Sequence, residues 1–375
     1  MNSFTWHPLA TLRDKSGTTT ARLATDIPAA RTNDPDTPHI ALAGFFNAIA
    51  KGQSPVIGAA NTAPDTAGAF FTRTGGTTGA PKLIRRSTNS WLHSIRILQS
   101  HLSLTPASQV ASVGDLSHSL TLYATVEALV TGAKMHLIGG SDLGSHAITH
   151  LYATPTQLRT IRTTVHSVNH VIVGGGPMDI ATQAHVASRF PNATVTRFYG
   201  AAETSFITLA SPSAPTGSVG TAFPGAEIEI RTPSGALCPA DQTGQVWVRS
   251  PMLFDHYAQG SAPHTVWRGD WLTVGELGSL NTDGFLTLKG RIDRIVTIAD
   301  QSVSLDDIES QLIQSGAKNA AVIALPDPLR GHVLHGFTTT DVPKHPLLKT
   351  QRTVPSLPTL SSGKTDYPSL SKGVS

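Results

Sequence analysis

The stretch Thr74-Gly75-Gly76-Thr77-Thr78-Gly79-Ala80-Pro81-Lys82 decides how this sequence is interpreted. Its three glycines allow backbone N–H groups to approach an anion without obstruction by a Cβ atom, and its hydroxyls add hydrogen-bond donors. Lys82 supplies a positive charge, and we expect a helix N-terminus shortly after it. The stretch therefore predicts a loop that holds a polyphosphate, with a flexible Gly/Thr surface loop as the alternative. It is not a Walker A loop, because Gly-Lys-Ser/Thr does not follow at the required spacing.

The sequence on both sides of this stretch alternates short apolar runs with helical patterns, from about residue 66 to 210. This alternation predicts an α/β layer with a parallel sheet. Ligands of such sheets bind beyond the carboxyl ends of the strands, where glycine turns at 139–140 and 174–176 fall. The expected strands are 69–72, 134–138, 170–173 and 194–199, and the expected helices are 87–98, 123–130 and 180–189.

The pattern changes after residue 217, where short alternating runs are separated by Gly and Pro turns up to residue 290. That texture is typical of antiparallel β structure. After Arg291 we expect a helix at 305–313 with Ser304 as its N-cap, a strand at 320–325 and a loop-rich tail beyond Pro343. The sequence thus predicts a large α/β domain with a β-subdomain over residues 1–290. A small α+β domain follows over residues 291–375.

Composition excludes several classes of protein. The 375 residues carry 28 Lys+Arg and 25 Asp+Glu, and this net charge of +3 gives no argument for nucleic-acid binding. Cys238 is the only cysteine, so intrachain disulfides and cysteine-cluster metal sites are excluded. The longest apolar stretch, residues 40–50, is about half the ~20 residues that span a bilayer, and it reads as a helix that closes at Lys51-Gly52. With no signal peptide evident at the start, we expect a soluble cytoplasmic protein.

Further motifs, in a fixed order, show a resemblance to a known family. Together with the stretch 74–82 they resemble the signature of the adenylate-forming (AMP-binding) superfamily, and most of all its small bacterial acyl-CoA synthetases. The resemblance covers about residues 66–370. The motifs are Thr154-Pro155-Thr156, Gly174-Gly175-Gly176-Pro177, Tyr199-Gly200-Ala201-Ala202-Glu203, Gly217-Ser218-Val219-Gly220, Gly275-Glu276, Asp283-Gly284-Phe285, Gly290-Arg291-Ile292-Asp293, and Leu357-Pro358 with Ser362-Gly363-Lys364.

The resemblance implies an ATP site. The phosphates would be held by the stretch 74–82, and Tyr199 would lie against adenine. The alternative for Tyr199 is an aromatic residue of the core at the end of a strand. Glu276 stands where the family usually has an Asp that binds the ribose hydroxyls, and Asp270 is a rival for that role. The full set that the resemblance assigns to the nucleotide is Thr74, Gly75, Gly76, Thr78, Gly79, Lys82, Gly175, Gly176, Tyr199, Gly200, Ala202, Glu276 and Arg291.

The resemblance also implies the catalytic groups. Glu203 and Thr77 would hold Mg²⁺, a hard cation that prefers oxygen ligands, and Lys364 would stabilise the charge that develops on the α-phosphate. Asp293 would be the hinge about which the small domain turns as a mobile lid. The acyl group would lie near His118, Gly174 and Ala201, although a packed structural role for His118 is nearly as well supported.

The implied function is ATP-dependent activation of a carboxylic acid to acyl-AMP, followed by thioester formation with CoA. The acid is fatty or aromatic, and the alternatives are an acyl- or aryl-carrier-protein ligase, with a phosphopantetheine carrier as partner, and a non-catalytic nucleotide-binding relative. Three departures stand out. Ala202 replaces a Thr or Ser that usually contacts the α-phosphate, Ala299 and Asp300 replace two glycines, and the region before residue 74 is short.

Overall fold

The computed structural model describes residues 3–15, 17–26, 37–57, 68–74, 82–360 and 364–374. These residues form two compact units. The first comprises residues 1–75, 81–227 and 248–261, and the second comprises 76–80, 228–247 and 262–375. The second unit therefore begins well before Arg291, and the division into 1–290 and a lid over 291–375 stays a prediction.

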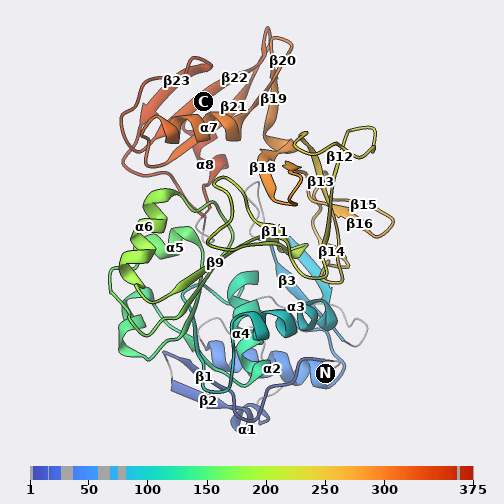
Figure 1. Ribbon diagram of the computed structural model, residues 1–375, viewed down its shortest axis with the longest axis vertical. Helices are drawn as coiled ribbons and strands as arrows, with labels where there is room; N and C mark the ends of the chain where they lie inside the picture. Colours follow the sequence, from blue (N-terminus) through green and yellow to red (C-terminus); the bar gives the residue numbers. More distant parts are fainter. Residues whose placement is uncertain are drawn as a thin grey trace. The chain divides into compact units, whose positions relative to one another are not determined.

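The first unit is built on a nine-stranded sheet with the order β11-β10-β9-β8-β7-β5-β6-β1-β2. Figure 1 labels β1, β2, β9 and β11 of this sheet. The central strands from β9 to β1 are parallel, while β2, β10 and β11 add antiparallel edges. This arrangement confirms the expected α/β fold with a mainly parallel sheet. The bounds are β1 Thr11–Asp14, β2 Gly17–Thr20, β5 Gln109–Ser112, β6 Lys134–Leu137, β7 His150–Ala153, β8 His170–Val173, β9 Thr194–Ala201, β10 Ser205–Ala210 and β11 Thr221–Ala222.

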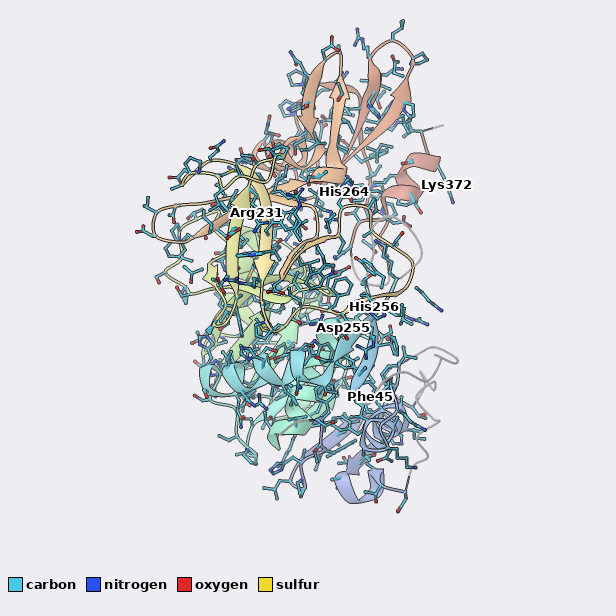
Figure 2. All side chains as sticks on the ribbon, turned by 90° about the vertical axis from the view of Figure 1, so that its right-hand side faces the viewer. Phe45, Arg231, Asp255, His256, His264 and Lys372 are labelled. Carbon is cyan, nitrogen blue, oxygen red and sulfur yellow. The ribbon has the colours of Figure 1, made fainter. Side chains whose placement is uncertain are left out.

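Helices cover both faces of this sheet because successive strand residues point to opposite faces. Tyr152 and Ile172 lie in one core, whereas Leu151 and Val171 lie in another. The first core packs under α2, α3 and α4, and Phe45 of α2, which Figure 2 labels, belongs to it. The second core packs under α5 and α6. The helices are α1 Ala21–Ala24, α2 Pro38–Ala50, α3 Thr88–His101, α4 Ser119–Thr131, α5 Pro155–Thr160 and α6 Ile180–Arg189, with a 3-10 turn at Gly140–Ser145.

The strand at the start of the glycine-rich stretch does not join the large sheet. It is β3 (Ala69–Arg73), which pairs with β4 (Leu83–Ser87), and β4 pairs in turn with β14 (His256–Gln259). All three strands are antiparallel. The stretch 74–82 therefore connects two paired strands of a separate small sheet, whereas the sequence pattern had placed the first of these strands in the parallel layer.

The second unit contains a six-stranded sheet, in which the pairs β13–β17, β15–β16 and β17–β18 are antiparallel, and a smaller α+β part. The helix expected at 305–313 is α7 (Leu305–Gln314), and the Ser304 hydroxyl accepts a hydrogen bond from the Asp307 N–H, as an N-cap does. The tail expected to be loop-rich contains a strand and a helix instead. The bounds are β12 Glu227–Arg231, β13 Gly244–Arg249, β15 Val266–Arg268, β16 Trp271–Thr273, β17 Glu276–Leu280, β18 Leu286–Arg291, β19 Ile295–Ile298, β20 Gln301–Ser304, β21 Ala320–Asp327, β22 Gly331–Thr338, β23 Leu348–Thr353 and α8 Tyr367–Lys372, with a 3-10 turn at Ile292–Arg294.

Membrane-spanning helices are absent from the described part of the chain, where every helix is too short or too polar to cross a bilayer.

Candidate active site

The two ends of the glycine-rich stretch, Thr74 and Lys82, meet directly beyond the last residue pair of β3 and β4. The backbone N–H of Thr74 donates to the carbonyl of Lys82 at 2.9 Å, directly beyond the Arg73–Leu83 strand pair. The loop-forming site candidates Gly75, Gly76, Thr77, Thr78 and Gly79 lie outside the described residues. The pairing of β3 with β4 therefore fixes both ends of the predicted phosphate loop.

A helix N-terminus lies beside this loop, but it is not the one expected. The strand β4 follows Lys82, so α3 begins only at Thr88. Instead, the Ser119 hydroxyl at the start of α4 donates to the Arg73 carbonyl at 3.2 Å, and His118 forms a β-bridge with Arg73. The partial positive charge of the α4 N-terminus is thereby held next to Thr74. His118, a predicted acyl-site residue, is the N-cap residue of that helix.

The glycine turn after β8 lies at the carboxyl edge of the parallel sheet. Gly174 is buried, and a Cβ atom there would lie 2.1 Å from the Phe198 ring. Gly175 has a φ of +83°, in the left-handed region that favours glycine. Gly175 and Gly176 are exposed, so their backbone is open to a ligand. The structure thus explains Gly174 and Gly175 locally and places the turn where such sheets bind ligands.

The motif at residues 199–203 forms the end of β9 and the tight turn into β10. A Cβ atom on Gly200 would lie 1.7 Å from the carbonyl oxygen of Ser205, so only glycine fits. The Thr204 hydroxyl accepts a hydrogen bond from the Ala201 N–H at 2.9 Å and stabilises the turn. Tyr199 to Glu203 are all half-buried at this edge. Ala202, the departure from the family pattern, offers this turn only a methyl group.

Tyr257 brings two of the predicted residues together and was missed by the sequence analysis. Its hydroxyl donates to Glu203 Oε1 at 2.7 Å, and its ring centroid lies 5.7 Å from Lys82 Nζ. It lies on β14, next to Asp255 and His256, which are labelled in Figure 2. No motif marks Tyr257 in the sequence, because its partner Glu203 is 54 residues away.

The donor set around Glu203 fits Mg²⁺ only with help from a phosphate. Within the described residues, no group of three or more His, Cys, Asp or Glu side chains could hold a metal ion. Glu203 supplies a single half-buried carboxylate, and the Tyr257 hydroxyl donates a hydrogen bond to one of its oxygens. Mg²⁺ commonly binds through one or two carboxylates together with substrate phosphates and water. Glu203 therefore fits a metal that arrives with a nucleotide.

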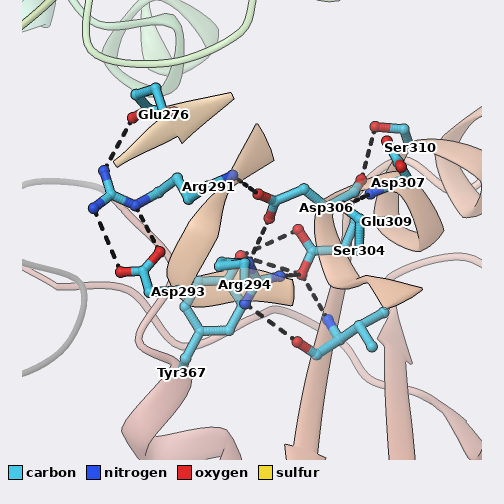
Figure 3. Close-up of polar contacts among 11 residues, drawn as sticks. Glu276, Arg291, Asp293, Arg294, Ser304, Asp306, Asp307, Glu309, Ser310 and Tyr367 are labelled. Atoms are coloured by element: carbon cyan, nitrogen blue, oxygen red, sulfur yellow. Dashed lines mark hydrogen bonds and ion pairs between the residues drawn. The ribbon is translucent and has the colours of Figure 1, made fainter. Parts of the chain in front are cut away.

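The second unit places Arg291 between two carboxylates (Figure 3). Its Nη1 donates to Glu276 Oε1 at 3.0 Å, and its Nε donates to Asp293 Oδ1 at 3.0 Å. Burial raises the pKa of Glu276, and the charge of Arg291 opposes this shift. Burial alone would lower the pKa of Arg291, but the hydrogen bonds and charges of Asp293 and Glu276 outweigh it and raise the pKa. Asp270, the rival candidate, is exposed in the β15–β16 turn.

A second polar cluster in the same unit connects the residues after Asp293 to α8. Arg294 binds Asp306 and Glu309, and its guanidinium lies 4.1 Å from the Tyr367 ring centroid. Burial raises the pKa of Glu309 to about 7, against the charge of Arg294. The Tyr367 hydroxyl donates to Glu309 at 3.2 Å, as Figure 3 shows. This cluster fixes the start of α8 against α7.

Lys364 is exposed and precedes that helix in the chain. Its carbonyl accepts from the Leu360 N–H at 2.8 Å, and Thr359 pairs with Thr365. Ser362 and Gly363, the other members of its motif, lie outside the described residues. The structure therefore gathers the predicted residues into two groups. One includes Thr74, Lys82, His118, Gly174–Gly176 and Tyr199–Glu203 in the first unit, and the other includes Glu276, Arg291 and Asp293 in the second.

These features are those of an α/β nucleotide-binding enzyme: an exposed glycine turn lies at the carboxyl edge of a parallel sheet, and Lys82 and Glu203 both contact Tyr257. The family model for "AMP-binding enzyme" matches residues 16–258, and the chain belongs to that family.

The comparison with curated proteins finds bacterial relatives. The chain is 28% identical over 322 residues to an "Uncharacterized acyl--CoA ligase YhfT" of Bacillus subtilis, covering 78% of this chain and 66% of that protein. It is 28% identical over 275 residues to a "Putative long chain fatty acid-CoA ligase VraA" of Staphylococcus epidermidis, covering 69% of this chain and 58% of that protein. The chain thus spans less than two thirds of the length of these relatives.

Solved structures share the fold. ATP-bound MatB from Rhodopseudomonas palustris superposes with a TM-score of 0.81 at 18% identity, covering 98% of this chain and 96% of that one. The O-succinylbenzoate coenzyme A synthetase MenE from Bacillus subtilis, in complex with ATP and magnesium ion, gives a TM-score of 0.68 at 22% identity, covering 80% and 69%. At these identities the likeness shows the fold alone.

Proposed function

We propose that this protein activates a carboxylic acid with ATP and passes the acyl group to the thiol of CoA. In the first step a carboxylate oxygen attacks the α-phosphorus of ATP, the bond from that phosphorus to the pyrophosphate oxygen breaks, and acyl-AMP and pyrophosphate form. In the second step the thiol sulfur attacks the acyl carbon, AMP leaves as a phosphate anion, and the thiol proton passes to water. The names of the curated relatives, which are acyl-CoA ligases, support this proposal.

The observation that carries the proposal is the meeting of Lys82 and Glu203 at Tyr257. Lys82 ends the predicted phosphate loop, and Glu203 is the predicted metal ligand 121 residues later in the sequence. The Tyr257 side chain contacts both, by a 2.7 Å hydrogen bond to Glu203 and a 5.7 Å approach to Lys82. A cation and a carboxylate beside one glycine-threonine loop suit a triphosphate that carries a divalent metal.

The residues divide the work as follows. Thr74, Gly75, Gly76, Thr78, Gly79 and Lys82 bind the phosphates. Gly175, Gly176, Tyr199 and Gly200 bind the adenine, Ala202 lies at the α-phosphate, and Glu276 with Arg291 binds the ribose. Mg²⁺, when bound to Glu203 and Thr77, supplies positive charge to the phosphates. His118, Gly174 and Ala201 bind the acid.

Lys364 stabilises the charge of the first step, since both reactants are anions. Asp293 acts as the hinge between residues 1–290 and a mobile lid over 291–375, which lets one site serve both steps. A cytoplasmic location belongs to the same proposal, because ATP and CoA are intracellular substrates.

A carrier protein with a phosphopantetheine arm is the second candidate acceptor. The turn between β19 and β20, where Ala299 and Asp300 adopt φ values of 44° and 68°, bears on both acceptors, because CoA and a carrier protein present the same phosphopantetheine thiol. The family usually has two glycines at this place, which the resemblance assigns to the approach of the thiol. Here two Cβ atoms and one negative charge stand at that approach.

Pyrophosphate release with a panel of fatty and aromatic acids tests the proposal. We expect release with one class of acid, and consumption of CoA when CoA is added. Absence of release with every acid, under conditions where ATP binds, would contradict the proposal. Persistence of acyl-AMP in the presence of CoA would favour a carrier protein as the acceptor.

A further inference from the structure

Arg86 is a buried cation that holds together several segments of the first unit. It lies on β4, four residues after Lys82, and its side chain is 0% exposed. Its Nη1 donates to the carbonyl of Ala202, and its Nη2 donates to the carbonyl of Met252 and to the Ser205 hydroxyl, the last at 2.6 Å. Its Nε donates to the Ser90 hydroxyl at 3.3 Å. One guanidinium therefore connects the strand after the phosphate loop to the β9–β10 turn and to residue 252.

The burial of this group costs free energy that its partners only partly offset. The oxygens that it binds are neutral, whereas a buried guanidinium is normally compensated by a carboxylate. Burial lowers the pKa of Arg86 to about 10, and the charges of Asp255 and Glu203 oppose that shift. The side chain thus stays positively charged at neutral pH. A cation buried at this cost is expected to fix the position of the backbone groups that it binds.

Arg86 holds the two backbone segments that carry Glu203 and Tyr257, and these two side chains are hydrogen-bonded to each other. Ala202 directly precedes Glu203, and Met252 is two residues before Phe254, whose N–H donates to the Glu203 carbonyl at 2.7 Å. Tyr257, which binds the Glu203 carboxylate, follows in the same segment as Met252. Movement of either carbonyl away from Arg86 would therefore displace the Glu203 carboxylate relative to Tyr257.

We infer that Arg86 is a positioning residue that sets where Glu203 presents its carboxylate to a nucleotide-bound Mg²⁺. This inference rests on the proposed function of Glu203 as a metal ligand. It extends that function to a residue in contact with neither the metal nor the nucleotide. The neighbouring Arg85 serves as the internal comparison, because successive strand residues point to opposite faces. The half-buried Arg85 pairs with the exposed Asp255 instead.

The test compares ATP binding by calorimetry in excess Mg²⁺ and in EDTA, for the full-length chain. In the Arg86→Lys variant, which keeps the charge but loses the planar fork, we expect the gain in ATP affinity from Mg²⁺ to fall by about tenfold or more. Affinity in EDTA should change by less than about twofold, because the phosphate loop is untouched. Arg85→Lys should match the wild type in both conditions.

A milder variant covers the case in which Arg86→Lys does not fold. Ser205 has a φ of 56°, so Ser205→Gly suits the backbone while removing the hydroxyl that binds Nη2. We expect a smaller loss of the Mg²⁺ effect, of about threefold, in a variant whose cooperative thermal unfolding shows that it folds.

The outcomes separate this inference from the proposed function. A wild type that binds ATP more tightly with Mg²⁺, beside an Arg86→Lys variant with the same gain, overturns the inference and leaves the proposed function standing. Equal weakening in Mg²⁺ and in EDTA also overturns it, since that result shows general damage to the site. A wild type that shows no effect of Mg²⁺ on ATP binding contradicts both.

Discussion

At the scale of single residues, the site depends on groups whose partners are distant in sequence. The resemblance assigned Glu203 and Lys82, but it gave no reason to single out Arg86 or Tyr257. Arg86 binds residues 116 and 166 positions away, and no local pattern encodes such contacts. One signal was available. Two successive arginines on a strand point to opposite faces, so one of Arg85 and Arg86 had to point inward.

A buried acid gives a prediction for the dependence of stability on pH. Glu127 on α4 is 0% exposed, and burial raises its pKa to about 8, while the Tyr152 hydroxyl donates to it. The folded state keeps this proton up to about pH 8, whereas the unfolded chain releases it near 4.5. The native state then binds more protons within this window, so the free energy of unfolding falls as pH rises through it.

Glu127→Gln should remove this contribution. Relative to the wild type, we expect the variant to gain up to about 5 kcal/mol in its free energy of unfolding between pH 4.5 and pH 8. Urea denaturation of both proteins at several pH values measures this difference. Parallel curves for the two proteins would show that Glu127 does not titrate in this way.

At the scale of elements, the sequence predicted the strands and helices whose burial signal is local. The strand at 170–173 and the helix at 180–189 match β8 and α6 to the residue. The pairing of β3 was not predictable, because its sheet is completed by β14 at residues 256–259. The strand β23 was missed because Leu348 at its start is its only buried residue, so the sequence carries little burial signal there. The strand forms through its pairing with β22.

The turn between β19 and β20 gives a prediction for an element. Ala299 and Asp300 are its two central residues, between the paired Ile298 and Gln301, and both have positive φ. A left-handed conformation costs an alanine roughly 1–2 kcal/mol that glycine does not incur. Ala299→Gly should therefore raise the free energy of unfolding by about 1 kcal/mol, measured by chemical denaturation.

The matched control for this turn is Ala240→Gly. Ala240 is exposed in a turn and lacks a positive φ. There glycine should lower stability by about 0.5–1 kcal/mol, because it only increases the entropy of the unfolded chain. A loss of stability at both positions would contradict the strain assigned to Ala299.

At the scale of the whole molecule, two steps with different chemistry must use one set of residues. In the proposed function, Lys364 acts in the first step only, because acyl transfer from acyl-AMP to a thiol has no triphosphate to stabilise. Lys364→Ala should slow pyrophosphate release by about 100-fold or more and leave thioester formation from supplied acyl-AMP within about threefold. Stopped-flow and quenched assays of the two half-reactions measure this split.

Lys372→Ala is the control for Lys364, since Lys372 is another exposed lysine of the same terminal segment (Figure 2). It should leave both half-reactions unchanged. Equal loss of both half-reactions in Lys364→Ala would contradict the role assigned to that residue.

The central claim is that the acid itself attacks the α-phosphorus of ATP. The most direct measurement uses an acid from the panel whose carboxylate carries ¹⁸O, with ATP and the acceptor thiol, and mass spectrometry of the AMP produced. Attack by the carboxylate followed by transfer of the acyl group leaves one acid-derived oxygen on the phosphate. The account predicts AMP that carries a single ¹⁸O atom, and unlabelled AMP formed together with the thioester would contradict it.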